Sequence, residues 1–358
     1  MSDKEMSFEE TNPSNNKGKG KENTAGSKRH DKEHLPWVEK YRPYTLSDLI
    51  SLDYITLTLD KFISERQFPH LLFYGPPGTG KTSTILACAR KLFGKDWDAS
   101  VMELNASDER GIDMVRDDIK GFASTRKLFS AGNEFKLVIL DEADGLTNIA
   151  QNALRRIVED YAKNVRFCFI CNNVQRLNPA LQSRCTRFRF RPLNQDQIKS
   201  RIEEIVKVEN VNITKDGIQA LLKLCGGDMR RALNVLQSCS SRDIIDESVI
   251  YNCTGYPHPK DIEIIMNSLS NDDFSTSYSK VKRMMEVLSM SLNDIITEVV
   301  NYFKMHNFPF NNEVLAYFFK KLRIIEHNIN GGGNDMIQLA ALIGAYKNAL
   351  EKAAELIV

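Results

Sequence analysis

The chain has 358 residues, a length that predicts two or three domains rather than one. Hydrophobic residues make up 42% and charged residues 27%, which is typical of a folded protein with apolar cores. The formal net charge is +1, so any nucleic-acid binding requires a local basic surface. No run approaches the ~18 consecutive apolar residues of a membrane-spanning helix, and the first residues lack the apolar core of a signal peptide. We therefore expect no membrane association and a location inside the cell.

Residues 1–34 are expected to form a disordered polar and basic tail. They carry few apolar side chains and are rich in Lys, Asn, Ser, Gly and Glu. Such a segment cannot bury enough surface to offset the entropy lost on ordering. The cluster ending at Lys28-Arg29 fits a nuclear import signal and fits a merely solvated tail at least as well.

Residues 35–193 are expected to form an α/β domain, because short apolar runs alternate there with amphipathic stretches. The runs predict strands at Leu71–Tyr74, Val101–Leu104, Leu137–Leu140, Arg166–Cys171 and Arg187–Phe190. Strands of four to six residues that alternate with helices predict a parallel sheet covered on both faces. Cys168 and Cys171 fall within one of these buried runs, so we expect buried thiols rather than a metal or redox pair.

After Pro192 the strand pattern stops and helical spacing continues to the end of the chain. One helix is predicted from about Asn194, a second ends at Gly226-Gly227, and a third begins at Asp228 as its N-cap. We expect residues 194–256 to form a small helical lid. Residues 257–358 carry no catalytic motif and are expected to form an all-α packing domain.

Residues Gly75–Thr82, with the sequence GPPGTGKT, match the full pattern G-x-x-x-x-G-K-[ST] and are called the phosphate-binding loop. A predicted strand precedes the loop and an amphipathic helix follows it, which is the context that the pattern requires. Its glycines let backbone N–H groups turn toward phosphate oxygens, and the helix N-terminus adds partial positive charge. Lys81 is expected to reach the β- and γ-phosphates of ATP, and Thr82 to place its hydroxyl on Mg²⁺.

Two carboxylates follow the apolar run Leu137–Leu140, at Asp141 and Glu142. A buried strand that ends in acids delivers them to the carboxyl edge of the sheet, where ligands bind. Asp141 is expected to hold Mg²⁺ through water, and Glu142 to orient and activate the attacking water. The alternative is a strand that ends in a solvated acidic turn. It is less favoured because the same chain carries a complete phosphate-binding loop.

Phosphoryl transfer also needs groups that offset the charge developing on the γ-phosphate, often from a neighbouring subunit. Asn172 and Asn173 follow a predicted strand, Arg184 precedes another, and Arg230 lies at the start of a predicted lid helix. By spacing alone, each of these residues could equally be an ordinary surface residue.

Five segments in this order resemble the successive boxes of replication factor C small subunits: Pro36–Pro43, the phosphate-binding loop, Asp141–Asp144, Ser183–Cys185 and Gly227–Arg231. The resemblance covers essentially everything after the tail. The segments Phe122–Arg126 and Ser183–Phe190 further resemble the subunit numbered five in animals and three in fungi.

The resemblance implies an AAA+ P-loop ATPase domain, a helical lid and an all-α collar domain. It implies a nuclear heteropentamer of replication factor C subunits that binds ATP and Mg²⁺ at subunit interfaces. That complex opens a sliding clamp (proliferating cell nuclear antigen) and loads it at primer–template DNA, with DNA- and clamp-stimulated ATPase activity, in replication and repair.

By the same resemblance, Arg184 is the finger that reaches a neighbour's ATP, Asn172 is sensor 1 and Arg230 is sensor 2. The residues implied to contact the nucleotide are Val38, Arg42, Gly75, Pro76, Pro77, Gly78, Thr79, Gly80, Lys81, Thr82, Ser83, Asn172 and Arg230.

The resemblance also implies contacts to the DNA backbone, and the candidates for them are Arg110, Arg116 and Lys120, on a predicted helix that begins near Ser107. Such phosphate contacts would give salt-sensitive binding without sequence preference. By charge alone, a solvated helix face is favoured, because Asp113, Asp117 and Asp118 lie among these cations.

Two other functions remain open at this point. The chain could be a mainly structural subunit, which binds ATP and lends Arg184 to a neighbour but hydrolyses little itself. It could also be an AAA+ remodeller that assembles with itself, although the Pro36–Pro43 segment, the Ser183–Cys185 segment and the helical C-terminal part speak against this.

Overall fold

The structure, a computed structural model, describes residues 34–50, 53–106, 112–124, 135–305 and 310–355, without the side chains of residues 53 and 112–117. The chain divides into two units, residues 1–42 and residues 43–358. In the first unit, helix α2 (Trp37–Lys40) is followed by Arg42, whose guanidinium donates to Glu39 at 3.2 Å. Residues 1–33 of the predicted disordered tail lie outside the described residues.

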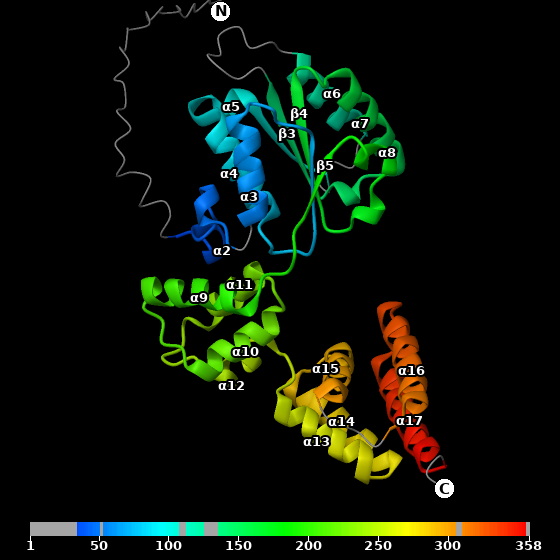
Figure 1. Cartoon of the computed structure of the whole chain (residues 1–358). Coiled ribbons are helices and arrows are strands. Elements are labelled where there is room, and N and C mark those ends of the chain that lie inside the picture. The colour runs from blue at the N-terminus through cyan, green and yellow to red at the C-terminus, as the bar shows by residue number, and fades with distance from the viewer. Residues whose placement is uncertain (1–33, 51–52, 107–111, 125–134, 306–309, 356–358) are drawn as a thin grey trace, which may run out of the picture. The chain divides into compact units, whose positions relative to one another are not determined.

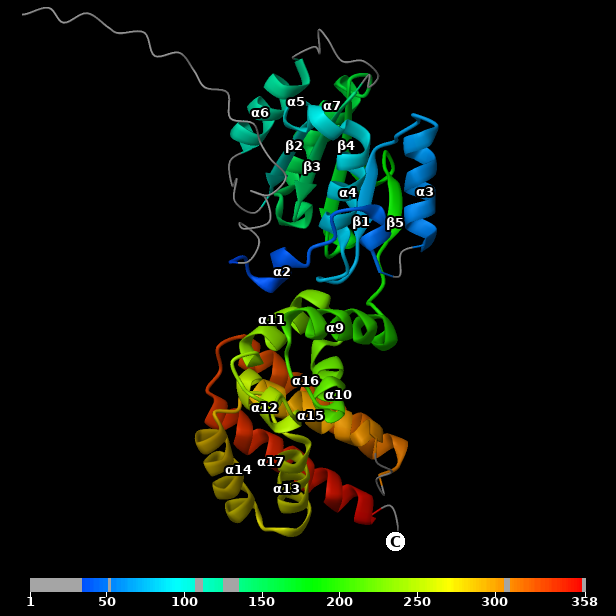
Figure 2. The same cartoon turned by 90° about the vertical axis from the view of Figure 1, so that its left-hand side faces the viewer.

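The second unit contains a five-stranded, all-parallel sheet (Figure 1). The strands are β1 (Leu71–Tyr74), β2 (Val101–Asn105), β3 (Lys136–Asp141), β4 (Val165–Cys171) and β5 (Thr186–Arg189). Their order across the sheet is β2-β3-β4-β1-β5, which Figure 2 shows from left to right. This order places β1 between β4 and the edge strand β5. The predicted parallel sheet is confirmed.

The sheet is covered by helices on both faces, as the near-continuous apolar strands predict. The helices are α3 (Asp53–Ser64), α4 (Lys81–Phe93), α5 (Trp97–Ser100), α6 (Ile112–Ser124), α7 (Asn148–Asp160) and α8 (Pro179–Gln182). Helices α3 and α4 pack on one face together with Leu71 and Phe73 of β1. Helices α6, α7 and α8 pack on the other face, where Leu72 points. Successive side chains of β1 therefore pack into two separate cores, one on each face of the sheet.

Cys168 and Cys171 are both buried, as predicted from their apolar surroundings. They lie three residues apart on β4, and successive side chains of a strand point to opposite faces. Cys168 accordingly belongs to the core on the α4 side and Cys171 to the core on the α7 side. Burial raises the pKa of the Cys171 thiol to about 12, which keeps it protonated. The two thiols therefore do not form a chelating pair.

Four helices follow the sheet: α9 (Gln195–Glu209), α10 (Lys215–Cys225), α11 (Met229–Cys239) and α12 (Glu247–Thr254). Their ends follow the predicted signals. Gly226 ends α10 in the left-handed conformation, and the Asp228 side chain caps α11 by accepting from the Arg231 N–H at 3.1 Å. Helix α12 was not among the predicted helices; Asp246 caps it by accepting from the Val249 N–H at 2.8 Å.

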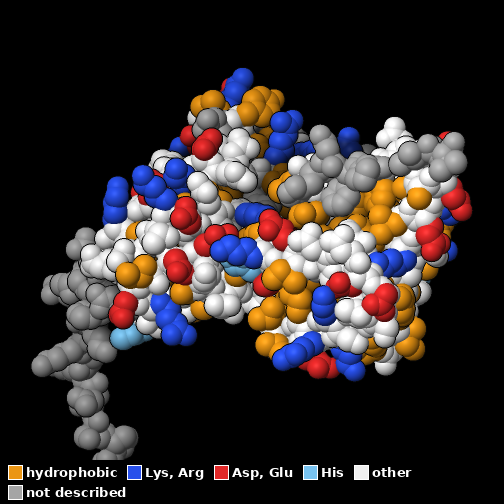
Figure 3. All heavy atoms as spheres, turned by 90° about the horizontal axis from the view of Figure 1, so that it is seen from below, with side chains coloured by type: hydrophobic (Ala, Val, Ile, Leu, Met, Phe, Trp, Pro, Cys, Tyr) orange, Lys and Arg blue, Asp and Glu red, His pale blue; other side chains and the backbone are white. Residues whose placement is uncertain are grey.

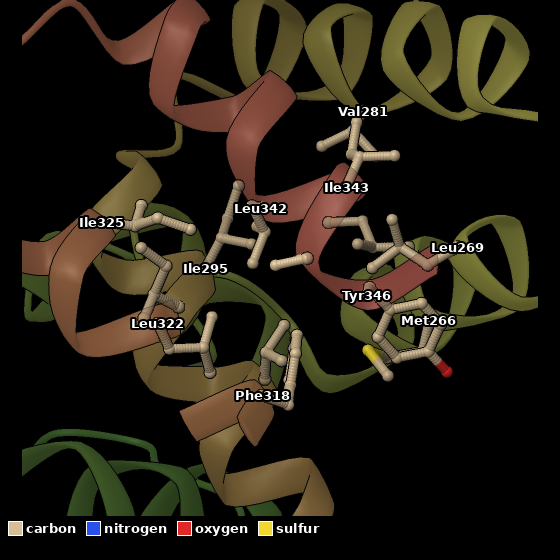
Figure 4. Packing of buried hydrophobic residues seen from close by; sticks show 14 of the residues in the cluster. Met266, Leu269, Val281, Ile295, Phe318, Leu322, Ile325, Leu342, Ile343 and Tyr346 are labelled. Atoms are coloured by element: carbon tan, nitrogen blue, oxygen red, sulfur yellow. The ribbon is translucent and has the colours of Figure 1, made fainter. Parts of the chain in front are cut away.

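Five longer helices complete the chain: α13 (Pro259–Asn271), α14 (Phe274–Leu288), α15 (Leu292–Met305), α16 (Asn312–Asn330) and α17 (Asp335–Glu355). The break between α16 and α17 falls at the glycine run 331–333. Figure 4 shows their buried side chains pointing toward one another, among them Phe318 of α16 and Tyr346 of α17. Both of these side chains are fully buried. The helices therefore share an apolar core of their own, consistent with the predicted all-α packing domain.

Charges are mixed rather than segregated on the surface seen in Figure 3, where basic and acidic side chains lie beside one another. This matches the formal net charge of +1. Within the described part of the chain, no helix has both the length and the apolar composition needed to span a bilayer.

Candidate nucleotide-binding site

The phosphate-binding loop connects the carboxyl end of β1 to the first residue of α4. Gly78 and Gly80 adopt φ values of 67° and 90°, a left-handed conformation that residues with a Cβ rarely take. These two residues turn the chain so that it enters α4 directly at Lys81. Pro76, Pro77 and Thr79 complete the loop, and Ser83 lies in the first turn of α4. The N-terminus of a 13-residue helix therefore faces the loop, the arrangement that binds phosphate groups in proteins.

Lys81 is only 7% exposed, and its ammonium contacts the carbonyl groups of this loop. It donates to the carbonyl oxygens of Gly75 and Pro76, both at 2.8 Å, and to Asn172 Oδ1 at 2.9 Å. Burial lowers the pKa of Lys81, whereas the negative charge of Asp141 acts in the opposite direction. The contact with Asn172 joins the loop after β4 to the loop after β1, as expected for neighbouring parallel strands.

Thr82 and Asp141 meet beside this ammonium. The Thr82 hydroxyl donates to Asp141 Oδ2 at 2.7 Å, although the residues are far apart in the sequence. Asp141 is the last residue of β3, and Thr82 is the second residue of α4. A hydroxyl and a carboxylate are hard oxygen ligands of the kind that Mg²⁺ binds alongside substrate phosphates. Thr82 and Asp141 are therefore suited to hold a magnesium ion.

Glu142 and Asp144 follow β3 and have different environments. Glu142 is exposed and takes a left-handed backbone conformation with φ 52°, and its N–H donates to Asp141 Oδ1 at 2.8 Å. Asp144 Oδ2 instead accepts from the backbone N–H groups of Asn172 and Asn173, at 3.3 and 3.0 Å. Sequence reasoning missed this function of Asp144, because nothing in its acidic turn indicates a partner on another strand.

The first turn of α11 reaches the phosphate-binding loop. The Met229 N–H donates to the Gly78 carbonyl at 3.3 Å. A Cβ at Gly78 would lie 1.6 Å from the Asp228 carboxylate, and the φ of 67° at Gly78 also favours glycine. Arg230 is exposed here, and its positive charge contributes to the lowered pKa of Lys81. The structure thus brings Arg230 to the site, and the contact with Asp228 is one that sequence analysis did not foresee.

Arg184 lies at the opposite edge of the sheet from the phosphate-binding loop. The parallel register pairs Leu71 with Thr186, so Arg184 lies beside the start of β1, whereas the loop follows its end. The four residues of β1 span about 13 Å at 3.3 Å per residue. The Arg184 guanidinium forms an ion pair with Glu159 and donates to the Ala180 carbonyl. Arg184 is therefore not part of its own chain's site.

The remaining candidates lie outside this cluster or outside the described residues. Arg110 falls in an undescribed segment, and Arg116 lies in α6 without a described side chain. Lys120 is half-buried in the same helix. Val38 and Arg42 belong to the first unit of the chain, so their nucleotide contacts stay a prediction.

Three family models match successive parts of the chain. "ATPase family associated with various cellular activities (AAA)" matches residues 71–193, "RCF1/5-like, AAA+ ATPase lid domain" residues 200–241, and "Replication factor C C-terminal domain" residues 257–345. The predicted fold class is therefore confirmed: a parallel α/β ATPase domain, a helical lid and an all-α C-terminal domain.

Several relatives match over nearly their whole length. Replication factor C subunit 3 of Schizosaccharomyces pombe is 47% identical, over 95% of this chain and 98% of that protein. Subunit 3 of Saccharomyces cerevisiae is 48% identical, over 92% and 97%. Subunit 5 of Mus musculus is 51% identical, over 88% and 92%. This chain belongs to the replication factor C family of AAA+ ATPases, as a relative of the subunits numbered three in fungi and five in animals.

Proposed function

We propose that this chain is an ATP-hydrolysing subunit of a nuclear replication factor C complex, which loads a sliding clamp onto primer–template DNA. The chain has the nucleotide-binding fold of its ATPase family. The observation that carries the proposal is the convergence of Lys81, Thr82, Asp141 and Asn172 at one edge of the sheet. Asp141 and Asn172 come from the carboxyl ends of β3 and β4, and Lys81 and Thr82 come from the helix that follows β1.

Each of these residues has a part in the proposed reaction. Lys81 binds the β- and γ-phosphates, and Asn172 holds the γ-phosphate beside it. Thr82 and Asp141 hold Mg²⁺, whose charge offsets that of the phosphates when it is bound. The exposed Glu142 orients the attacking water and accepts its proton.

We assign Arg184 to the ATP of a neighbouring subunit. Its position at the amino edge of the sheet, with Glu159 as its partner, supports this assignment because its own phosphate-binding loop is too distant. Arg230 is assigned to this chain's own nucleotide, supported by the contact between the first turn of α11 and Gly78. The proposed arrangement requires at least one partner subunit, because Arg184 serves the ATP of a neighbour whereas Arg230 serves this chain's own nucleotide.

The proposed organisation follows from the same family. Residues 35–193 form the ATPase domain, residues 194–256 the lid and residues 257–358 the collar through which subunits assemble as a heteropentamer. Arg110, Arg116 and Lys120 are proposed to contact the DNA backbone. Val38 and Arg42 are proposed to contact the nucleotide.

A clamp-loading assay with the reconstituted complex tests the proposal. Clamp retained on primed circular DNA is measured after gel filtration, with and without ATP. We expect retention to require ATP and to be lost with Lys81→Ala but kept with Lys91→Ala, an exposed lysine later on α4 that pairs with Asp60 at 2.9 Å. Equal retention with Lys81→Ala would contradict the proposal.

A second variant separates hydrolysis from a mainly structural role. Glu142→Gln preserves the shape of the side chain but removes its ability to accept a proton. If this chain hydrolyses ATP, the variant complex has lower ATPase activity than the wild-type complex. Unchanged activity would leave the chain as a structural subunit that supplies Arg184 to its neighbour.

A further inference from the structure

A buried carboxylate in the C-terminal all-α domain has partners from its own helix and from two other segments. Glu298 of α15 is only 6% exposed, and carboxylates are rarely buried to this extent unless they are paired. Its Oε1 accepts from the Tyr256 hydroxyl at 3.2 Å and from Asn301 Nδ2 at 2.9 Å. Its Oε2 forms an ion pair with the Lys223 ammonium at 3.5 Å. All four residues belong to the second unit of the chain.

Two of these partners lie outside the C-terminal domain. Lys223 lies in the last turn of α10 in the lid, and Tyr256 lies in the linker 255–258 between α12 and α13. Burial and the charge of Glu298 raise the pKa of Tyr256, so its hydroxyl stays protonated and donates. The Glu298 carboxylate therefore connects α15 both to the lid and to the linker.

The linker is also held at the end that joins α12. The His258 ring lies against the Tyr251 ring of α12, with their centroids 5.0 Å apart. The Tyr256 N–H donates to the Tyr251 carbonyl at 3.3 Å, and Pro257 is buried. These contacts restrict the linker, so it does not act as a free hinge that would absorb a displacement of the lid.

Lys223 is close in sequence to the nucleotide-binding site. Asp228, five residues further along the chain, approaches Gly78 of the phosphate-binding loop. The Met229 N–H donates to the Gly78 carbonyl at 3.3 Å. The end of α10 and the start of α11 therefore lie between two contacts, one with the phosphate-binding loop and one with Glu298.

We propose that Glu298 couples the phosphate-binding loop to the C-terminal domain through its contact with Lys223. A nucleotide that displaces the start of α11 also displaces the end of α10, and with it the Lys223 ammonium. The ion pair passes this displacement to α15, whose Ile295 and Val299 are fully buried in the core of the C-terminal domain. The inference rests on the proposed binding of ATP, and it makes the domain proposed to assemble the subunits responsive to that nucleotide.

Hydrogen–deuterium exchange of the full-length chain tests the proposal, with and without a non-hydrolysable ATP analogue and Mg²⁺. In the wild type, we expect the analogue to slow exchange in the phosphate-binding loop and to change exchange in α15. Glu298→Gln keeps an oxygen that accepts from Tyr256 and Asn301 but loses the charge that holds Lys223. It should keep the effect of the analogue at the loop and lose the effect in α15. A merely structural role of Glu298 would change exchange equally with and without the analogue.

Lys223→Met removes the same contact from the lid side. Lys223 is exposed and Glu298 keeps its other two partners, so this variant separates coupling from folding. It should also lose the effect of the analogue in α15. Lys215→Met, at the exposed first position of α10, is the matched control and should respond as the wild type does.

The outcomes distinguish the coupling from the nucleotide binding on which it rests. A change in α15 of wild-type size in either Glu298→Gln or Lys223→Met would overturn the proposal. So would a wild-type chain in which the analogue protects the phosphate-binding loop but leaves α15 unchanged. Absence of protection at the loop itself would contradict the proposed nucleotide binding, and the coupling with it.

Discussion

At the scale of single residues, the nucleotide site depends most on the Lys81 ammonium, whose three donors all meet oxygen atoms. Lys81→Ala should lower ATP affinity at least about tenfold, because a hydrogen bond to a charged group contributes roughly 1.5–3 kcal/mol. Isothermal titration with a non-hydrolysable ATP analogue measures this. Lys91→Ala, on the same helix, is the matched control, and equal affinities of the two variants would contradict the assignment of the phosphate-binding loop.

Asn172 should affect hydrolysis more than binding. Its Oδ1 already lies 2.9 Å from the Lys81 ammonium, where the γ-phosphate would lie. Asn172→Ala should reduce single-turnover hydrolysis in the complex about 10²-fold, the usual effect of removing one polar group that stabilises developing charge. ATP affinity should change little.

Asn173→Ala provides the control for Asn172. The Asn173 side chain caps a short helix by accepting from the Gln175 N–H at 3.0 Å, so its loss should cost about 1 kcal/mol of stability. It should not slow hydrolysis. If Asn173→Ala were the slower variant, the wrong amide would have been assigned.

Much of this site could be predicted from the sequence, because its chemistry is concentrated in short motifs. The phosphate-binding loop and Asp141 both stand at the ends of strands that the apolar runs predicted. The contact of Asp144 with the backbone after β4 and the close approach of Asp228 to Gly78 could not be predicted. Each is a short polar side chain whose partner lies on another element, and no local spacing encodes such a pairing.

At the scale of secondary-structure elements, a half-buried histidine, His70, directly precedes β1, and its charge should affect stability. His70 Nδ1 accepts from the Phe167 N–H of β4 at 3.1 Å, which requires a neutral ring nitrogen. Burial, helped by the charge of Arg166, lowers the pKa of His70 from 6.5 to about 4. As pH falls from 6.5 to 4, the unfolded chain therefore takes up a proton that the folded chain does not.

Stability should accordingly decrease through this pH window, by up to about 3 kcal/mol, and level off below pH 4. Urea unfolding followed by tryptophan fluorescence at pH 7 and pH 5 measures the change. His70→Asn keeps a hydrogen-bond acceptor but cannot titrate, so its unfolding midpoint should depend less on pH. An equal dependence in both proteins would exclude His70 as the cause.

The elements that sequence reasoning placed less well are short. The predicted strand Arg187–Phe190 is observed as Thr186–Arg189, because the pairing with β1 begins at Leu71↔Thr186. Helix α12 spans 8 residues and was not predicted, since so short an element offers little more than two turns of apolar periodicity. Both errors concern elements whose limits depend on a neighbouring element.

At the scale of the whole molecule, Arg184 lies beside the start of β1, away from its own phosphate-binding loop, and we propose that it serves the ATP of another subunit. Arg184→Ala should leave this chain's own ATP affinity unchanged. In the assembled complex, hydrolysis at the neighbouring site should fall roughly 10³-fold, the lower end of the range for such arginines. Single-turnover hydrolysis by the complex measures this effect, which should appear as the loss of activity at one of its several ATP sites.

Glu159→Ala separates this role from a structural one. It removes the ion-pair partner of Arg184 but keeps the guanidinium, so hydrolysis in the complex should be retained. If both variants lost activity equally, the ion pair itself would be the important feature. If neither did, Arg184 would have no part in the mechanism.

The central claim is that this chain works as one subunit of a clamp loader, and the composition of its native complex tests this most directly. The tagged chain is purified from its own cells, and the mass and subunit content of the assembly are determined by native mass spectrometry. We predict four different partners in equal amounts, one of them larger than the rest. A ring of identical chains or a lone monomer would contradict the clamp-loader assignment while leaving the ATPase fold in place.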